Sequence, residues 1–136
     1  GEGEIIKLID KLKNKPYFKI IRNLTHNDYL SLMKNVDIMI GNSSSGIIEA
    51  PSMKIPVINI GTRQTGRERC ENIIDVPADK DKIIESIDFA LNNRDFQKKV
   101  KKCKSMFGNG SASKKIVKIL QEIELNNELI QKQINY

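Results

Sequence analysis

The apolar residues of this chain follow two patterns, which alternate along the sequence. Spacing at every third or fourth position over residues 2–13, ending before Pro16, predicts an amphipathic helix with a stop. Short continuous apolar runs instead predict buried strands, because a parallel sheet is covered on both faces. Strands are predicted at 36–40, 56–60 and 73–76, with a short β-favouring run at 18–21.

Helical patterns separate the predicted strands. Thr25 with Asp28 predicts a helix that runs to about Met33, and Asp79 predicts the cap of a later helix. Strands that alternate with helices predict a parallel sheet covered on both faces, so the predicted fold class is α/β, a three-layer Rossmann-like sheet. The apolar faces of the last three helices are predicted to be Ile83, Ile84, Ile87 and Leu91, then Phe96, Val100, Cys103 and Phe107, then Ile116, Val117, Leu120 and Ile123.

The chain has 136 residues, the size of one ordinary domain with a real core. Its apolar runs fall far short of the roughly 20 residues that span a bilayer, and its amphipathic start is unlike a signal peptide. We therefore expect a cytoplasmic protein without a membrane partner. Cys70 and Cys103 have neither redox nor zinc spacing, and His26 is the single histidine, so free thiols and no metal are expected.

The net charge is +6, and lysines cluster at 98–104 and 114–118. Both clusters lie within predicted helices, where runs of charge usually form the solvated face. No RNP, KH or zinc-finger motif accompanies them, so a nucleic acid is not an expected partner.

A loop of small polar residues at 41–46 (GNSSSG) follows the first predicted buried strand and precedes a short helix that reaches Pro51. In such folds ligands bind at the carboxyl ends of the strands, and helix N-termini attract anions. Three serines add hydroxyl donors, whereas no lysine follows as it does in a P-loop. The loop therefore predicts phosphate binding, with a plain serine N-cap as the alternative.

Two further features accompany this loop. Glu49 lies about one turn into the helix, where a ribose is a better partner than a phosphate; a solvent-facing glutamate is the alternative. The loop at 61–69 carries Arg63, Arg67 and Arg69 and leaves the next strand at the same edge of the sheet. Arginine suits bidentate phosphate contacts, and a mobile basic loop is the alternative. Because both loops suit an anion and follow adjacent strands, each strengthens the prediction that the other binds phosphate.

The stretch GNSSSGIIEAPSMKIPVINIGTRQTGRERCENIIDV resembles the UDP-N-acetylglucosamine 2-epimerase family, most closely its hydrolysing branch. The resemblance covers residues 17 to about 125 and rests on the serine motif, the spacing to Glu49, the arginine loop and Asn72. It implies the GT-B architecture of two Rossmann-like domains, of which this chain is similar to the carboxyl-terminal, UDP-binding one. Residues 1–125 would form that domain, truncated at its start, and 126–136 would form a helical or frayed tail.

The resemblance also implies residue roles. No catalytic residue is expected in this chain, because the family's catalytic carboxylates belong to the amino-terminal domain, and this chain alone is expected to be inactive. No cofactor or metal is implied, because fixed donors stabilise the leaving diphosphate. In the implied site Ser44 and Ser45 bind the diphosphate, Gly46 allows close approach, Glu49 holds the ribose, Arg63 lies beside the phosphates and Tyr29 lies against the uracil.

The implied function is the nucleotide-sugar binding part of an epimerase that releases an N-acetylmannosamine-type sugar and UDP for sialic-acid-like synthesis. Donor binding in a GT-B glycosyltransferase is the alternative, and the GTRQ-GRE loop favours the epimerase. The expected partners are UDP or a UDP-N-acetylhexosamine and the amino-terminal domain. A second copy of the chain is a further candidate partner, because surface left exposed by a missing domain favours self-association; the sequence does not give the oligomeric state.

Overall fold

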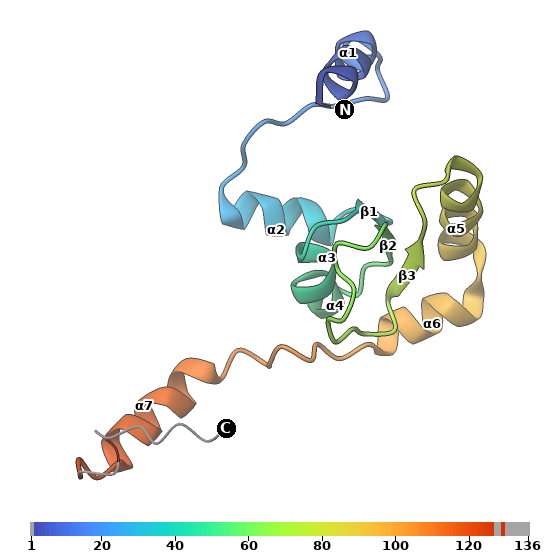
Figure 1. The fold of residues 1–136 in the computed structure, drawn as a ribbon. Coiled ribbons are helices and arrows are strands. Elements are labelled where there is room, and N and C mark those ends of the chain that lie inside the picture. The colour runs from blue at the N-terminus through green and yellow to red at the C-terminus, as the bar shows by residue number, and fades with distance from the viewer. Residues whose placement is uncertain (1, 127–128, 130–136) are drawn as a thin grey trace. The chain divides into compact units, whose positions relative to one another are not determined.

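The computed structural model describes residues 2–126 and 129, and the chain divides into two compact units, Gly1–Val36 and Asp37–Tyr136 (Figure 1). The tail predicted at 126–136 lies almost entirely outside the described residues. The second unit holds every strand in the described ranges. None of the helices in these ranges combines the length and apolar character of a membrane span.

The first unit consists of two helices, α1 (Glu2–Leu12) and α2 (His26–Lys34), joined by a loop. α2 begins as the sequence predicts, because Thr25 Oγ1 accepts a hydrogen bond from the Asp28 N–H at 3.2 Å. The strand predicted at 18–21 is wrong, since these residues lie in the loop. A strand needs a neighbour for its N–H and C=O groups, and the described part of this unit contains no other strand.

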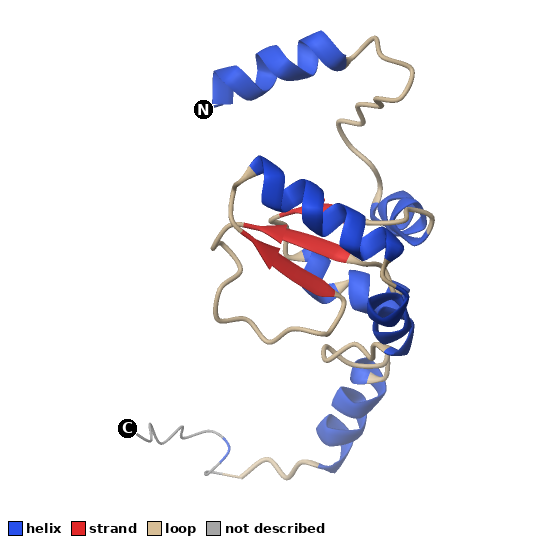
Figure 2. Cartoon of the chain, turned by 90° about the vertical axis from the view of Figure 1, so that its right-hand side faces the viewer, coloured by secondary structure: helices blue, strands red, loops and turns tan. Residues whose placement is uncertain are grey.

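The second unit is built on a parallel sheet of three strands, as the apolar runs predict. Met39 pairs with Val57, and Val57 pairs with Ile73, so the carboxyl ends of the strands meet at one edge. Figure 2 shows the strands as adjacent arrows that point the same way. In sheet order the strands are β1 (Met39–Gly41), β2 (Val57–Ile60) and β3 (Ile73–Val76).

Helices cover both faces of this sheet (Figure 1). One face packs against α5 and α6 and forms the apolar core, in which Ile58 of β2 and Ala90 are fully buried. The other face packs against α3, where Gly46 lies directly over Val57. The predicted α/β fold, with a parallel sheet between helical layers, is confirmed. The helices of this unit are α3 (Ser45–Ile48), α4 (Ala50–Met53), α5 (Lys80–Asn92), α6 (Arg94–Lys102) and α7 (Ala112–Glu122).

The predicted apolar faces are buried to different extents: Phe96, Val100 and Cys103 are buried as predicted, whereas the other two faces are less buried than the sequence suggests. The face of α5 that packs on the sheet is narrow, and Ile84 and Leu91 are 53% and 38% exposed. α6 ends at Lys102, so Phe107 lies beyond the helix and is 51% exposed. Every side chain of α7 is exposed, including its predicted apolar face. The α5 residues that reach the core are Ile83, Ile87 and Ala90.

Candidate functional site

The two candidate loops leave neighbouring strands at the same edge of the sheet. The serine loop, residues 41–46, begins with the last residue of β1, and the arginine loop, residues 61–69, directly follows β2. Because β1 and β2 are parallel partners, both loops emerge at the carboxyl edge, as predicted. Gly61 turns the chain out of β2 with φ +78°, a left-handed conformation that favours glycine.

The serine loop enters α3 with several donors that find no acceptor in the described part of the chain. Ser43 Oγ accepts a hydrogen bond from the Ser45 N–H at 3.3 Å. Ser44 has helical angles (φ −62°, ψ −20°) and its hydroxyl makes no capping bond, so a plain N-cap at Ser44 is not supported. Among the described residues, the N–H groups of Ser43 and Ser44 and the hydroxyls of Ser44 and Ser45 donate to no protein acceptor. These groups are available to an anionic ligand.

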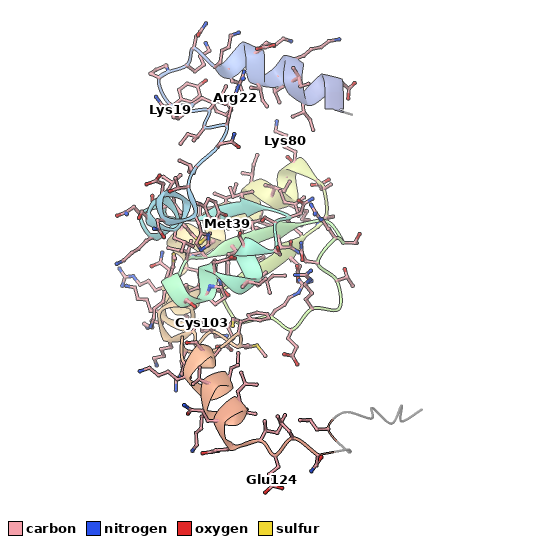
Figure 3. The ribbon with its side chains drawn as sticks, turned by 90° about the vertical axis from the view of Figure 1, so that its left-hand side faces the viewer. Lys19, Arg22, Met39, Lys80, Cys103 and Glu124 are labelled. Carbon is pink, nitrogen blue, oxygen red and sulfur yellow. The ribbon has the colours of Figure 1, made fainter. Side chains whose placement is uncertain are left out.

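Gly46 is buried against the sheet. A Cβ at this position would lie 2.8 Å from Val57 Cγ1 and 3.8 Å from the sulfur of Met39, which Figure 3 labels. From the sequence, the expected reason for a glycine here is that it lets a ligand approach the backbone closely. The structure provides a second reason, because α3 can pack this closely on β2 only without a side chain at residue 46.

Glu49 lies at the break between α3 and α4. The helical ladder stops there because Pro51 has no N–H to donate to the carbonyl of Ile47. The Glu49 side chain is half-buried, and in the described part of the chain its buried Oε2 has no hydrogen-bond partner. A buried acceptor without a donor is unfavourable. This argues against the solvent-facing alternative and favours a ligand that supplies a hydroxyl.

The arginines of the second loop divide into two kinds. Arg63 and Arg67 are exposed, and neither makes an ion pair with any described residue. Arg69 is largely buried, forms an ion pair with Asp75 on β3 and donates to the backbone carbonyl of Gln64. Two of the three predicted phosphate-binding arginines are therefore available to a ligand, whereas Arg69 holds the loop to the sheet.

Sequence reasoning missed a polar network beneath these loops. Gln64 is 3% exposed, and its Nε2 donates to the backbone carbonyl of Asn42 in the serine loop at 2.7 Å. Asn59 and Asp75 are register partners on β2 and β3, and Asn59 Nδ2 donates to Asp75 Oδ1 at 2.6 Å. The available signal was a polar residue within each of two apolar strands; Asn59 is buried and paired, whereas its partner Asp75 remains exposed.

Tyr29 and His26 belong to α2 in the first unit. The Tyr29 N–H donates to the carbonyl of Thr25 at 2.9 Å, within the first turn of the helix, and its side chain is half-buried. The uracil contact predicted for Tyr29 stays a prediction.

Both cysteines are free thiols, and Cys70 is near enough to Cys103 to act on its pKa. Cys70 donates to the carbonyl of Lys104 at 3.2 Å, and Cys103 is buried. Burial raises the pKa of the Cys103 thiol, and neighbouring Cys70 raises it further, while the N–H groups of Glu71 and Asn72 oppose the shift. In the described ranges no group of three or more acidic, histidine or cysteine side chains is placed to hold a metal.

The parallel sheet, its two helical layers and the polar loops at its carboxyl edge define an α/β domain of the Rossmann-like class. Residues 2–121 match the family model described as UDP-N-acetylglucosamine 2-epimerase. The chain belongs to this family, and the membership favours the epimerase over the glycosyltransferase alternative.

Two curated relatives and one solved structure show how far the similarity extends. The chain is 36% identical over 131 residues to UDP-N,N'-diacetylbacillosamine 2-epimerase (hydrolyzing) of Legionella pneumophila, which covers 96% of this chain and 33% of that protein. It is 59% identical over 63 residues to GDP/UDP-N,N'-diacetylbacillosamine 2-epimerase (hydrolyzing) of Campylobacter jejuni, which covers 46% and 16% respectively. The structure of Methanocaldococcus jannaschii UDP-GlcNAc 2-epimerase in complex with UDP-GlcNAc and UDP is similar with a TM-score of 0.65 at 28% identity, which covers 87% of this chain and 32% of that one. The chain thus spans a third or less of the length of these relatives.

Proposed function

We propose that this chain is the carboxyl-terminal, UDP-binding part of a 2-epimerase that hydrolyses its nucleotide sugar. The observation that carries the proposal is the pairing of two loops at one edge of the sheet. Among the described residues, the serine loop has donors without acceptors and the arginine loop has cations without ion-pair partners. A diphosphate offers the negative charge and the acceptors that both loops lack. The hydrolysing relatives from Legionella and Campylobacter support the reaction outcome, and the Methanocaldococcus complex supports a UDP-type ligand.

The proposed site has one role for each of its polar groups. The hydroxyls and free N–H groups of the serine loop bind the diphosphate, and an arginine neutralises its charge. The half-buried carboxylate accepts from the ribose hydroxyls, which would satisfy its unpartnered oxygen. We assign the diphosphate to Ser44, Ser45 and Arg63 with close approach at Gly46, the ribose to Glu49 and the uracil to Tyr29, within a domain formed by residues 1–125.

In this proposal the chain contributes to catalysis by stabilising the leaving group. The C2 proton of the sugar is removed, UDP leaves by elimination, and water then adds to release an N-acetylmannosamine-type sugar. Charge grows on the diphosphate as its bond to the sugar breaks, so donors already fixed around it lower the barrier. The acid and base that move the C2 proton would belong to an amino-terminal domain, so the chain alone binds UDP weakly without turnover.

The proposal is tested by calorimetric titration of the chain with UDP. Arg63 is exposed and has no ion pair among the described residues, so Arg63→Ala removes a ligand contact without removing an internal one. We expect a loss of about 1.5–3 kcal/mol, which is roughly a 10- to 100-fold weaker affinity. Arg94→Ala, at an exposed position in α6, is the matched control and should leave the affinity unchanged. The proposal is contradicted if the wild-type chain binds no UDP in a titration that can detect a Kd of about 1 mM.

A further inference from the structure

Gln64 is an unusual side chain for its position in the arginine loop. Within residues 61–69 it is the one residue that is almost completely buried, at 3% exposure, whereas Arg63 and Thr65 on either side are exposed. Polar side chains in surface loops are normally solvated, and those that are buried are held by hydrogen bonds. The burial of Gln64 therefore calls for a partner inside the protein.

The partner lies in the other loop of the site. Gln64 Nε2 donates to the backbone carbonyl of Asn42 at 2.7 Å, across 22 positions of the chain. A trans peptide is planar, and its C=O and N–H point in opposite directions. Fixing the carbonyl of Asn42 therefore also fixes the direction of the Ser43 N–H, which is one of the unused donors of the serine loop.

Gln64 is itself anchored to the sheet. Its backbone carbonyl accepts from the guanidinium of Arg69, and Arg69 is paired with Asp75 on β3. Asp75 in turn accepts from Asn59 on β2 at 2.6 Å. The position of the serine loop is thus connected through Gln64 to two strands of the sheet.

The carboxamide oxygen of Gln64 shows that filling space is not the reason for a glutamine at this position. In the described structure Gln64 Oε1 is buried and has no hydrogen-bond partner. An apolar side chain of similar size would fill the same space without leaving an unsatisfied acceptor. The opposite orientation of the amide would place two oxygen atoms against each other at Asn42, so the donor must face the carbonyl.

We propose that Gln64 is a positioning residue, whose buried carboxamide locks the serine loop to the arginine loop so that both present one preformed diphosphate site. This inference rests on the proposed function for the identity of the ligand. Binding to preformed donors avoids the loss of conformational freedom that a loose loop would undergo on binding. Gln64 touches no part of the ligand itself in this proposal.

The test compares Gln64→Met with the wild-type chain, because methionine keeps the volume and removes the donor. Affinity for UDP is expected to fall about tenfold, while affinity for uridine, which has no phosphates, stays within about twofold. Amide hydrogen exchange, followed by NMR without ligand, is expected to accelerate about tenfold at Ser45 and Gly46 relative to α5. Gln121→Met, at an exposed position in α7, is the control and should change neither measurement.

A second variant tests the hydrogen bond itself. In Gln64→Glu, an ionised carboxylate is repelled by the carbonyl oxygen of Asn42. When the carboxyl group is protonated, its O–H donates a hydrogen bond to the same carbonyl. Relative to wild type at each pH, its UDP affinity should recover below about pH 5. This variant also serves if Gln64→Met unfolds the chain.

Equal losses of UDP and uridine affinity in Gln64→Met would overturn the inference, because a merely structural role weakens both. Unchanged exchange at Ser45 and Gly46, with UDP still bound by the wild type, would overturn the lock and leave the proposed function standing. If Gln64→Met accelerates amide exchange at Ser45 and Gly46 but the wild-type chain binds no UDP, the lock stands and the proposed diphosphate site is overturned. No recovery of Gln64→Glu at acidic pH would also count against the hydrogen bond to Asn42.

Discussion

Replacing Gly46 by alanine would place a methyl group 2.8 Å from Val57 Cγ1. Ordinary contact between carbon atoms is about 3.5–4.0 Å, so one of the two groups must move by roughly 1 Å. Val57 is 3% exposed in β2, between two strands, and its branched side chain has little freedom to rotate. We therefore expect Gly46→Ala to lower the free energy of unfolding of the second unit by about 1–3 kcal/mol.

The interpretation is tested by a double-mutant cycle with urea denaturation. Val57→Ala alone removes two buried methyl groups, at about 0.8 kcal/mol each plus a cavity term. The alanine at residue 46 would occupy that space, so the double variant should be more stable than the sum of the two losses by about 1–2 kcal/mol. Gly3→Ala is the control, because a Cβ there meets no described atom within 4 Å, and it should not destabilise α1. Additive losses in the cycle would refute the steric argument.

Three further predictions concern the second unit. Asp79 Oδ1 accepts from the Lys82 N–H at 3.0 Å, so Asp79→Ala should lower the free energy of unfolding, measured by urea denaturation, by about 0.5–2 kcal/mol. Asp79→Asn should retain the cap. Because burial raises the pKa of the Cys103 thiol, the folded state keeps this proton to higher pH than the unfolded state, and stability should fall as pH rises above the ordinary thiol pKa. Iodoacetamide should label half-buried Cys70 before Cys103, and equal labelling rates would contradict this assignment.

The elements that the sequence predicts correctly are those with local signals. Thr25 and Asp79 cap their helices with bonds to residues three positions later, so a short stretch of sequence is sufficient to predict both. The run at 18–21 has the composition of a strand but forms none, because a strand also depends on a partner elsewhere in the chain. The same limit explains Ile84, whose exposure depends on how α5 lies on the sheet.

For the site, the sequence predicts which loops meet but not how they are held. The serine and arginine loops follow adjacent parallel strands, and strand order alone brings them to one edge. The contact from Gln64 to Asn42 joins two segments 22 positions apart through one side-chain atom, and no periodicity or composition signals it. Gly46 shows the converse, because a ligand-based prediction selected a residue that packing against Val57 also requires.

Different parts of the second unit therefore support its stability and the geometry of the site. The apolar core lies on the face covered by α5 and α6, and it includes Ile58 and Val100. The loops are held at the carboxyl edge by polar bonds, from Asn59 through Asp75 to Arg69 and Gln64. Substitutions in the core should change the fraction of folded molecules while the folded ones retain the same loop geometry. Substitutions in this series of polar bonds should change the loop geometry while most molecules stay folded. Each bond contributes little net free energy yet fixes the direction of a donor.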